Sequence, residues 1–228
     1  MAPKAIISYD GTAYDQDALA LGRVLGEAGV TLQLAYVRHA MESQREREQL
    51  EESEADQLLE AGARALGDLD VERRVILSAS TAEGLRWLAQ EEDADIIVFG
   101  SDYRTAAGHV VPQHSAQQLL EGGPAAVALA PASYRTEQSS QFGRIGVLAA
   151  PGDDEAIATA RDLAEVFGAR VTRDEPYVDL LVVGSRPESP EGQVIISSHA
   201  QHEIENATSP VLVVPRGVRI PFAVPVRA

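Results

Sequence analysis

Two short sequence patterns each occur twice in this chain, and their repetition limits the possible folds more than any other feature. The repeated pieces are an apolar run ending in Gly-Ser and a later apolar run beside proline. They are Asp95–Ser101 with Asp179–Ser185, and Pro124–Pro131 with Ser209–Pro215. Repetition across half a chain indicates two structural units of one kind. The sequence therefore predicts two domains.

Strand-like and helix-like segments alternate in the first unit. The expected strands are Lys4–Tyr9, Thr31–Val37, Val71–Ser78, Asp95–Phe99 and Ala125–Ala130. The expected helices are Asp15–Gly29, Met41–Leu66, one capped by Thr81, and one near Pro112–Glu121. Because parallel strands need crossover helices, the alternation predicts an α/β fold with two doubly wound parallel-sheet domains.

The polar segment Tyr134–Phe142 separates the units and is interpreted as a linker. The predicted domains are 1–134 and 143–217, followed by a tail, 218–228. The second domain is shortened, because it has no counterpart of the long helix, the third strand and the third helix. Its segment Ala169–Thr172 is interpreted as an edge fragment.

Each unit ends in an apolar strand that would form an exposed sheet edge if left alone. We expect these strands, Ala125–Ala130 and Val211–Val214, to lie antiparallel in one continuous sheet or in direct contact. The two domains would then form a pseudo-dimer within one chain. The apolar segment Ile220–Val226 is expected to cover a sheet edge or a partner subunit.

Composition excludes several classes of function. The chain has 35 acidic and 19 basic residues, a formal net charge of −16, and no cysteine. Such a charge disfavours nucleic acid and anionic membranes as partners, and the lack of cysteine excludes disulfides and thiolate metal sites. No apolar run is long enough to span a bilayer, and no signal peptide precedes the first strand. We expect a cytoplasmic protein.

The histidines and serines give no recognisable catalytic or metal motif. His199 and His202 could share a helix face, but no HExxH pattern is present. Ser115 and Ser198 each have a neighbouring histidine, and adjacent residues on a helix do not face each other. We therefore expect no enzyme activity, no catalytic residue and no metal ligand.

Three stretches resemble the universal stress protein family. They are Tyr9–Leu19, Gly100–Pro131 and Gly184–Gly217. The resemblance implies a five-stranded parallel sheet and, in ATP-binding members, an Asp after the first strand. It also implies a glycine motif after the fourth strand: Gly, two residues, Gly, nine residues, then Gly-Ser or Gly-Thr. Such glycines let the backbone approach phosphate oxygens.

The sequence departs from this motif in both halves. In the first, Tyr103 and Gln113 replace the second and third glycines, and His114 takes the hydroxyl position. In the second, Pro187 replaces the second glycine, and Ala149-Ala150 stands where the first half has Asp10. Any ATP or AMP is therefore expected in the first domain only, and no cofactor is certain.

The candidate ligand site combines the end of the first strand, the second strand and the loop after the fourth. Its residues are Asp10, Gly11, Thr12, Val37, Gly100, Ser101, Gly108, His114 and Ser115. Plainer interpretations stand beside this one. Asp10 could belong to a simple Asp-Gly turn, and Gly100 could be required by a tight strand end. Gln113 and His114 could fill the phosphate space with their side chains.

Two functions from different classes follow. The first is a non-enzymatic stress-response scaffold or interaction module with a degenerate ATP motif. The alternative is an adenine-nucleotide sensor with a single site in domain 1. An ATP-consuming ligase has little support, because the loop after the first strand lacks a pyrophosphate-binding pattern. The protein partners stay unidentified, and the sequence leaves open a homodimer.

Overall fold

A computed structural model describes residues 2–39, 45–136, 142–173, 175 and 177–223, with only the main chain of residues 45–52. The first half contains β1 (Lys4–Ser8), α1 (Asp15–Glu27), β2 (Thr31–His39), α2 (Arg45–Leu66), β3 (Glu72–Ser78), α3 (Thr81–Glu91), β4 (Ile96–Gly100), α4 (His114–Leu120), β5 (Glu121–Gly123) and β6 (Ala126–Ala130). After the 3-10 helix η1 (Tyr134–Thr136), the second half contains β7 (Arg144–Leu148), α5 (Asp154–Phe167), β8 (Arg170–Thr172), β9 (Leu180–Gly184), β10 (Val194–Ile195), α6 (Ser198–Glu205) and β11 (Val211–Val214).

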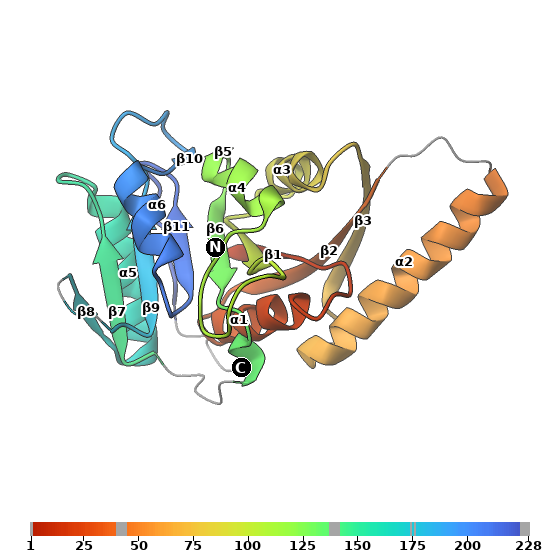
Figure 1. Ribbon diagram of the computed structural model, residues 1–228, viewed down its shortest axis with the longest axis horizontal. Helices are drawn as coiled ribbons and strands as arrows, with labels where there is room; N and C mark the ends of the chain where they lie inside the picture. The colour runs from red at the N-terminus through yellow and green to blue at the C-terminus, as the bar shows by residue number, and fades with distance from the viewer. Residues whose placement is uncertain (1, 40–44, 137–141, 174, 176, 224–228) are drawn as a thin grey trace.

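One nine-stranded sheet runs through the described chain, in the order β3-β2-β1-β4-β6-β11-β9-β7-β8. Every neighbouring pair is parallel except β6 and β11. Helices α1, α2 and α5 pack on one face, and α3, α4 and α6 pack on the other (Figure 1). The central strand β4 is buried along its whole length, as its apolar sequence requires. The predicted α/β fold with a largely parallel, doubly wound sheet is confirmed.

The two halves meet where β6 and β11 pair. These strands run antiparallel, with Val211 opposite Leu129 and Val213 opposite Val127. All residues of both strands are buried, so each strand removes an apolar edge of the other half from water. The predicted antiparallel contact is confirmed. Strands β5 and β10 form a second, small antiparallel sheet across the same boundary.

The second half keeps fewer elements than the first. Its strands follow the order β11-β9-β7-β8, and β8 pairs with β7 at the edge of the sheet. This confirms Arg170–Thr172 as an edge fragment, three residues long. In the described tail, Ile220 and Phe222 are buried, and the Ile220 N–H donates to Thr159 Oγ1 of α5 at 3.1 Å. The tail therefore packs against α5, a helix on the sheet face, rather than on a sheet edge.

Several predicted boundaries need correction. Ser80, not Thr81, caps α3, because the Ser80 hydroxyl accepts from the Glu83 N–H at 3.2 Å. Helix α4 begins at His114, two residues after Pro112, and the short α4 is capped by Gln113 without a side-chain bond. The predicted start of the long helix, Met41, lies outside the described residues, as does part of the predicted linker. Among the helices that the structure describes, none is long and apolar enough to cross a membrane.

Candidate functional site

The carboxyl ends of parallel strands are where doubly wound sheets bind ligands. In the first half, β1 ends just before Asp10, and β4 ends at Gly100. Strand β2 continues to His39, so the expected strand end at Val37 is wrong. The Val37 side chain is buried and packs against Gly84 of α3. The Val37 side chain thus belongs to the core, and only its main chain could face a ligand.

The loop between β1 and α1 folds around a buried carboxylate that the sequence analysis missed. One oxygen of Asp15 accepts the N–H groups of Asp10 at 2.8 Å and Thr12 at 3.0 Å. The exposed Asp10 accepts from the Thr12 N–H at 3.1 Å, and Gly11 takes a positive φ of 83°. The predicted site residues Asp10, Gly11 and Thr12 are therefore together, in a turn that Asp15 organises.

Asp15 has an unusual acidity. Burial is the main cause that raises the pKa of its carboxyl group to about 7. The hydrogen bond with Asp10 and the charge of Asp10 contribute to the rise, while the N–H groups of Asp10 and Thr12 oppose it. Its side chain is only 6% exposed, so an ionised carboxylate there loses most of its hydration. The site thus holds two neighbouring carboxyl groups, one exposed and one buried.

A second buried acid, Asp17, ties α1 to the end of the first half. Its oxygens accept the N–H groups of Ser133 and Arg135, each at 2.9 Å, and the Arg135 guanidinium at 3.2 Å. These partners lie more than a hundred residues after Asp17 in the sequence. Asp17 therefore fixes where the chain leaves β6, which is a structural role.

The space above Gly100 is filled by the chain itself. A Cβ on Gly100 would collide with the carbonyl oxygen of Tyr14. From the other side, the Gln113 side-chain amide donates to the Gly100 carbonyl at 3.4 Å. The rings of Tyr14 and Tyr103 lie 6.3 Å apart over the same strand end, and Arg104 stacks on Tyr103. Gly100 is therefore needed for close packing of the β1–α1 loop.

Ser101 and Gly108 have structural partners that recur in the second half. The buried Ser101 hydroxyl donates to Ala130 O at 2.7 Å, and Ser185 donates to Val214 O at 2.8 Å, 29 residues along the chain in both cases. The Gly108 N–H donates to Ala132 O at 2.7 Å with φ at 79°.

Gly192 repeats this geometry with φ at 78°, and its N–H donates to Arg216 O at 2.9 Å. Gly108 is therefore out of register with the phosphate motif but in register with Gly192. Both glycines take a backbone conformation that residues with a side chain rarely adopt. Of the remaining candidates, His114 is exposed and Ser115 half-buried in the first turn of α4.

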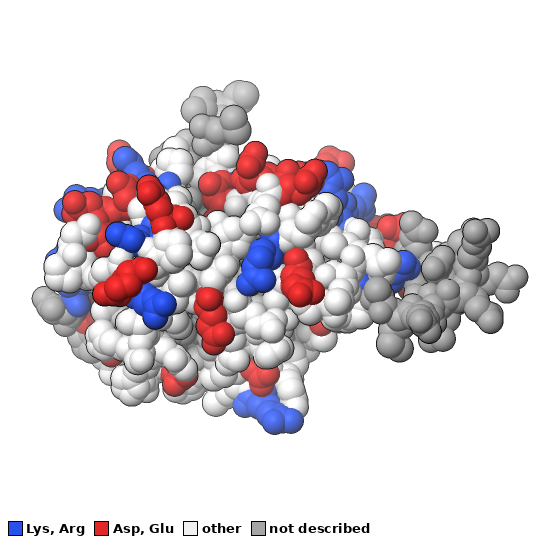
Figure 2. Space-filling view, turned by 90° about the horizontal axis from the view of Figure 1, so that it is seen from above, with Lys and Arg blue, Asp and Glu red and all other residues white. Residues whose placement is uncertain are grey.

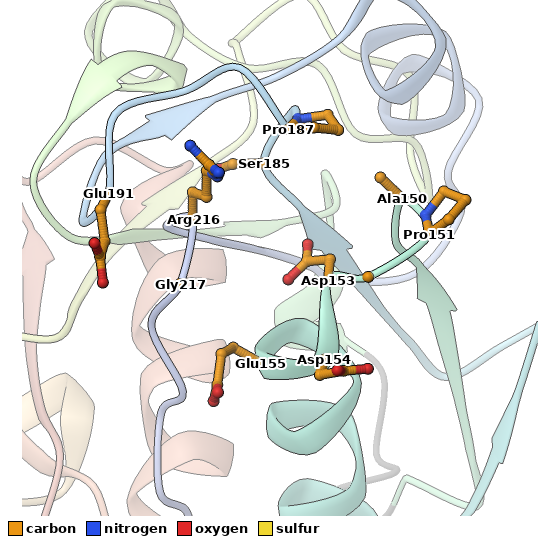
Figure 3. A pocket seen from close by; sticks show the side chains of 11 residues that line it. Ala150, Pro151, Asp153, Asp154, Glu155, Ser185, Pro187, Glu191, Arg216 and Gly217 are labelled. Carbon is orange, nitrogen blue, oxygen red and sulfur yellow. The ribbon is translucent and has the colours of Figure 1, made fainter.

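A cavity of about 480 Å³ lies at the strand ends of the second half (Figure 3). Its lining consists of Ala150, Pro151, Gly152, Asp153, Asp154, Glu155, Ser185, Pro187, Glu191, Arg216 and Gly217. Four carboxylates and one guanidinium line it, so the cavity is acidic. The sequence placed any ligand in the first half only, because the second half lacks an Asp after its first strand. That expectation took no account of the acidic residues at the start of α5, the helix that follows the first strand of the second half.

Asp153 stands at the start of α5 in this cavity. One oxygen accepts the Ala156 N–H at 3.3 Å, and the other lies against the Cα of Gly184. Burial raises the pKa of Asp153, and the neighbouring carboxylates add to this, while the Ala156 N–H and Arg216 lower it. Arg216 donates to the Ser189 carbonyl oxygen at 2.6 Å, which holds its side chain at the rim.

No cluster of three or more His, Asp or Glu side chains placed to hold a metal ion occurs among the residues that the structure describes. His199 and His202 lie on α6, as expected. The His199 ring lies 4.0 Å from Glu203, and the His202 ring contacts the Asn206 amide at 3.3 Å. Their neighbours are thus Glu203 of the same helix and Asn206, the residue that follows the helix.

The sheet order and the crossover helices define an α/β protein of the doubly wound class. Residues 109–215 match the model of the universal stress protein family, from the loop before α4 to the residue after β11. Over these residues the chain is similar to the universal stress protein family.

Solved structures share the fold across nearly the whole chain. A universal stress protein from Archaeoglobus fulgidus DSM 4304 has a TM-score of 0.69 at 14% identity, covering 94% of this chain and 98% of its own. A functionally unknown protein from Pseudomonas aeruginosa PAO1 has a TM-score of 0.62 at 13% identity, with 94% and 93% coverage. A putative universal stress protein from Pseudomonas aeruginosa UCBPP-PA14 has a TM-score of 0.61 at 13% identity, with 93% of both chains covered. No curated protein sequence matches the chain.

Proposed function

We propose that this chain is a universal stress protein that acts as a non-enzymatic interaction module with a degenerate ATP motif. The observation that carries the proposal is the packing above Gly100. The Tyr14 main chain and the Gln113 side chain occupy the strand end where an ATP-binding member would leave bare glycine backbone. A phosphate group there would have to displace both. The function then depends on surfaces of the protein rather than on turnover of a nucleotide.

We also propose that the protein is a tandem repeat that acts as an internal pseudo-dimer in the cytoplasm during stress. Two features support the tandem arrangement: the antiparallel β6–β11 contact and the equivalent Ser101 and Ser185 hydrogen bonds. The net charge of −16 favours protein partners over nucleic acid. Figure 2 shows a row of acidic side chains near one edge of the face in view, with acidic and basic side chains interspersed elsewhere. The acidic row is suited to a cationic patch on a partner.

A small-ligand sensor is the second candidate function. The cavity beside Asp153 favours it, because its position at the strand ends is where doubly wound sheets hold ligands. The acidic lining favours a neutral ligand such as adenosine over AMP, and AMP over a triphosphate. The sensor alternative thus applies to the second half, in addition to the Asp10 turn of the first.

The two functions are separated by measuring ligand content and affinity. Native mass spectrometry of the protein as purified identifies any bound small molecule, and calorimetry compares adenosine, AMP, ADP and ATP. We expect no bound nucleotide and no preference for ATP. Asp153→Ser keeps an N-cap side chain and removes the carboxylate, so it tests the cavity, while Asp10→Ala tests the turn. ATP binding about a hundredfold tighter than AMP would contradict a degenerate motif, since this is about 2.7 kcal/mol of phosphate recognition.

A further inference from the structure

Strand β3 forms one edge of the nine-stranded sheet. In the part of the chain that the structure describes, it pairs with β2 on one side only. Alternate residues of an edge strand direct their N–H and C=O groups outward, where another strand can bind them. Strand β3 has seven residues, whereas β8 at the opposite edge has three. It is therefore the longer template for strand addition.

Exposed apolar side chains lie on the same strand. Leu77 is 60% exposed and Val75 is 36% exposed. Ile76, between them, is buried in the cluster that contains α3, so Val75 and Leu77 point to the opposite face, which α2 covers in part. Natural edge strands are commonly protected by charges, prolines or bulges. The first three residues of β3 are charged in this way, whereas the stretch from Val75 to Ser78 carries no charge and no proline.

Helix α2 overhangs this edge. Figure 1 shows that α2 diverges from β3 toward its N-terminal end and extends past the sheet. Its C-terminal part is anchored, since Leu59, Ala63 and Leu66 are buried in the core. A cavity of about 570 Å³ separates it from β3, lined by Asp56, Leu59, Glu60, Arg73, Arg74 and Val75. The overhanging part of α2 would lie over any strand added to the edge.

We propose that β3 is a homodimer interface, in which β3 of a second copy adds antiparallel across a two-fold axis. In the register that pairs the whole strand, Val75 lies opposite the partner subunit's Val75, and Leu77 lies opposite the partner's Arg73. Residues directly opposite in an antiparallel pair share a face. The exposed Val75 and Leu77 of both copies then form one apolar row, and each α2 projects over the row of the other copy.

The charges on β3 favour a second copy in this register. With Val75 at the axis, the strand's Glu72, Arg73 and Arg74 face uncharged residues of the partner, so no like charges are opposed. A shift that centres the axis on Arg74 would oppose two guanidinium groups. Asp56 of α2 and Arg73 line the same cavity within one copy, so an acid of the same chain already lies near Arg73. The overall charge of −16 opposes association, so salt should strengthen it.

Sedimentation velocity over a concentration series, at physiological and at raised salt, tests the interface. The wild-type chain should approach twice the mass of one chain. Leu77→Lys should raise the dimer dissociation constant by at least about tenfold, because it places a charge in the apolar row. Tyr177→Lys is the matched control, because Tyr177 is 70% exposed and lies in the second half, away from β3. This variant should dimerise as the wild type does.

A second measurement keeps the test independent of folding. Circular dichroism should show that Leu77→Lys stays folded, because its side chain is exposed. Hydrogen exchange of β3 amides should slow as wild-type concentration rises, and should not slow in Leu77→Lys. A wild-type chain that is monomeric at every concentration and salt would overturn the proposal and leave the edge to a strand of another protein. A dimer that Leu77→Lys does not weaken would overturn it equally.

Discussion

Replacing Asp15 with asparagine tests the acidity of the β1–α1 loop. In the wild type, a single oxygen of Asp15 accepts both the Asp10 and the Thr12 N–H groups. Asparagine keeps one oxygen for these bonds, and its NH₂ group can donate to the Asp10 carboxylate as a protonated Asp15 would. The variant therefore imitates the neutral form of Asp15 and cannot ionise.

The magnitude follows from the difference between the folded and the unfolded protein. In the unfolded chain Asp15 should titrate near its usual 3.8, whereas burial first, and then Asp10, raise its pKa in the folded protein to about 7. Between these values the folded state binds more protons, so the free energy of unfolding falls as pH rises from about 4 to about 7. At about 1.36 kcal/mol per pKa unit, the loss approaches 4 kcal/mol at most.

The assay is urea unfolding of wild type and Asp15→Asn at a series of pH values from about 4 to about 8. We expect similar stabilities at the acid end, and an Asp15→Asn variant that is more stable by a few kcal/mol above pH 7. Asp56→Asn, at an exposed position of α2, is the matched control and should change stability little at either pH. Parallel pH profiles for wild type and Asp15→Asn would show that folding does not raise the pKa of Asp15, and would refute the reasoning.

Four further substitutions test the packing of the site, each by urea unfolding. Gly100→Ala should destabilise the protein by about 1–3 kcal/mol, because the added Cβ would collide with main chain. Gly26→Ala in α1 should cost less, because its Cβ would meet only the Leu32 side chain; equal effects would contradict this. Ser101→Ala and Ser185→Ala should each lower the free energy of unfolding by about 1–3 kcal/mol, and by similar amounts, because their buried hydrogen bonds are equivalent. A loss in only one half would argue against equivalent loops. Asp17→Asn should cost about 1.5–3 kcal/mol by weakening charge-assisted bonds, and an unchanged unfolding midpoint would exclude this role.

The fold could be predicted because its signals are local and repeated. Apolar runs such as β4 and β9 identify buried parallel strands, and the alternation with helices determines how those strands connect. The β6–β11 contact could also be predicted, since both strands are too apolar to remain as edges. Boundaries were less accurate at Ser80 and at His114, because a cap depends on which hydroxyl reaches a free N–H group.

The site could be predicted only in part, because its contacts are not local. Asp10, Gly11 and Thr12 do lie together, as a turn sequence suggests. The sequence gives no sign that Asp15 accepts their N–H groups, since several acids lie within one turn of helix there. Asp17 contacts a segment more than a hundred residues away, which no spacing rule reveals.

A comparison of the two halves separates what holds the fold from what can differ in function. The hydroxyls of Ser101 and Ser185 and the left-handed Gly108 and Gly192 make the same main-chain contacts in both halves. Those residues fasten the loop to the sheet, so a ligand is not needed to explain their presence.

Two of the differences between the halves lie where the first helix begins and where the loop glycine is bound. The residue before the first helix is Tyr14 in one half and Asp153 in the other, each packed on the glycine that ends the central strand. The residue that accepts from the loop glycine is Ala132 in the first half and Arg216 in the second. One half is therefore closed by an aromatic residue and its main chain, while the other presents an acid and a base to a cavity. Where the loops share the same main-chain contacts, a difference in binding between the halves should come from these positions, together with the helices and the strand that the second half lacks.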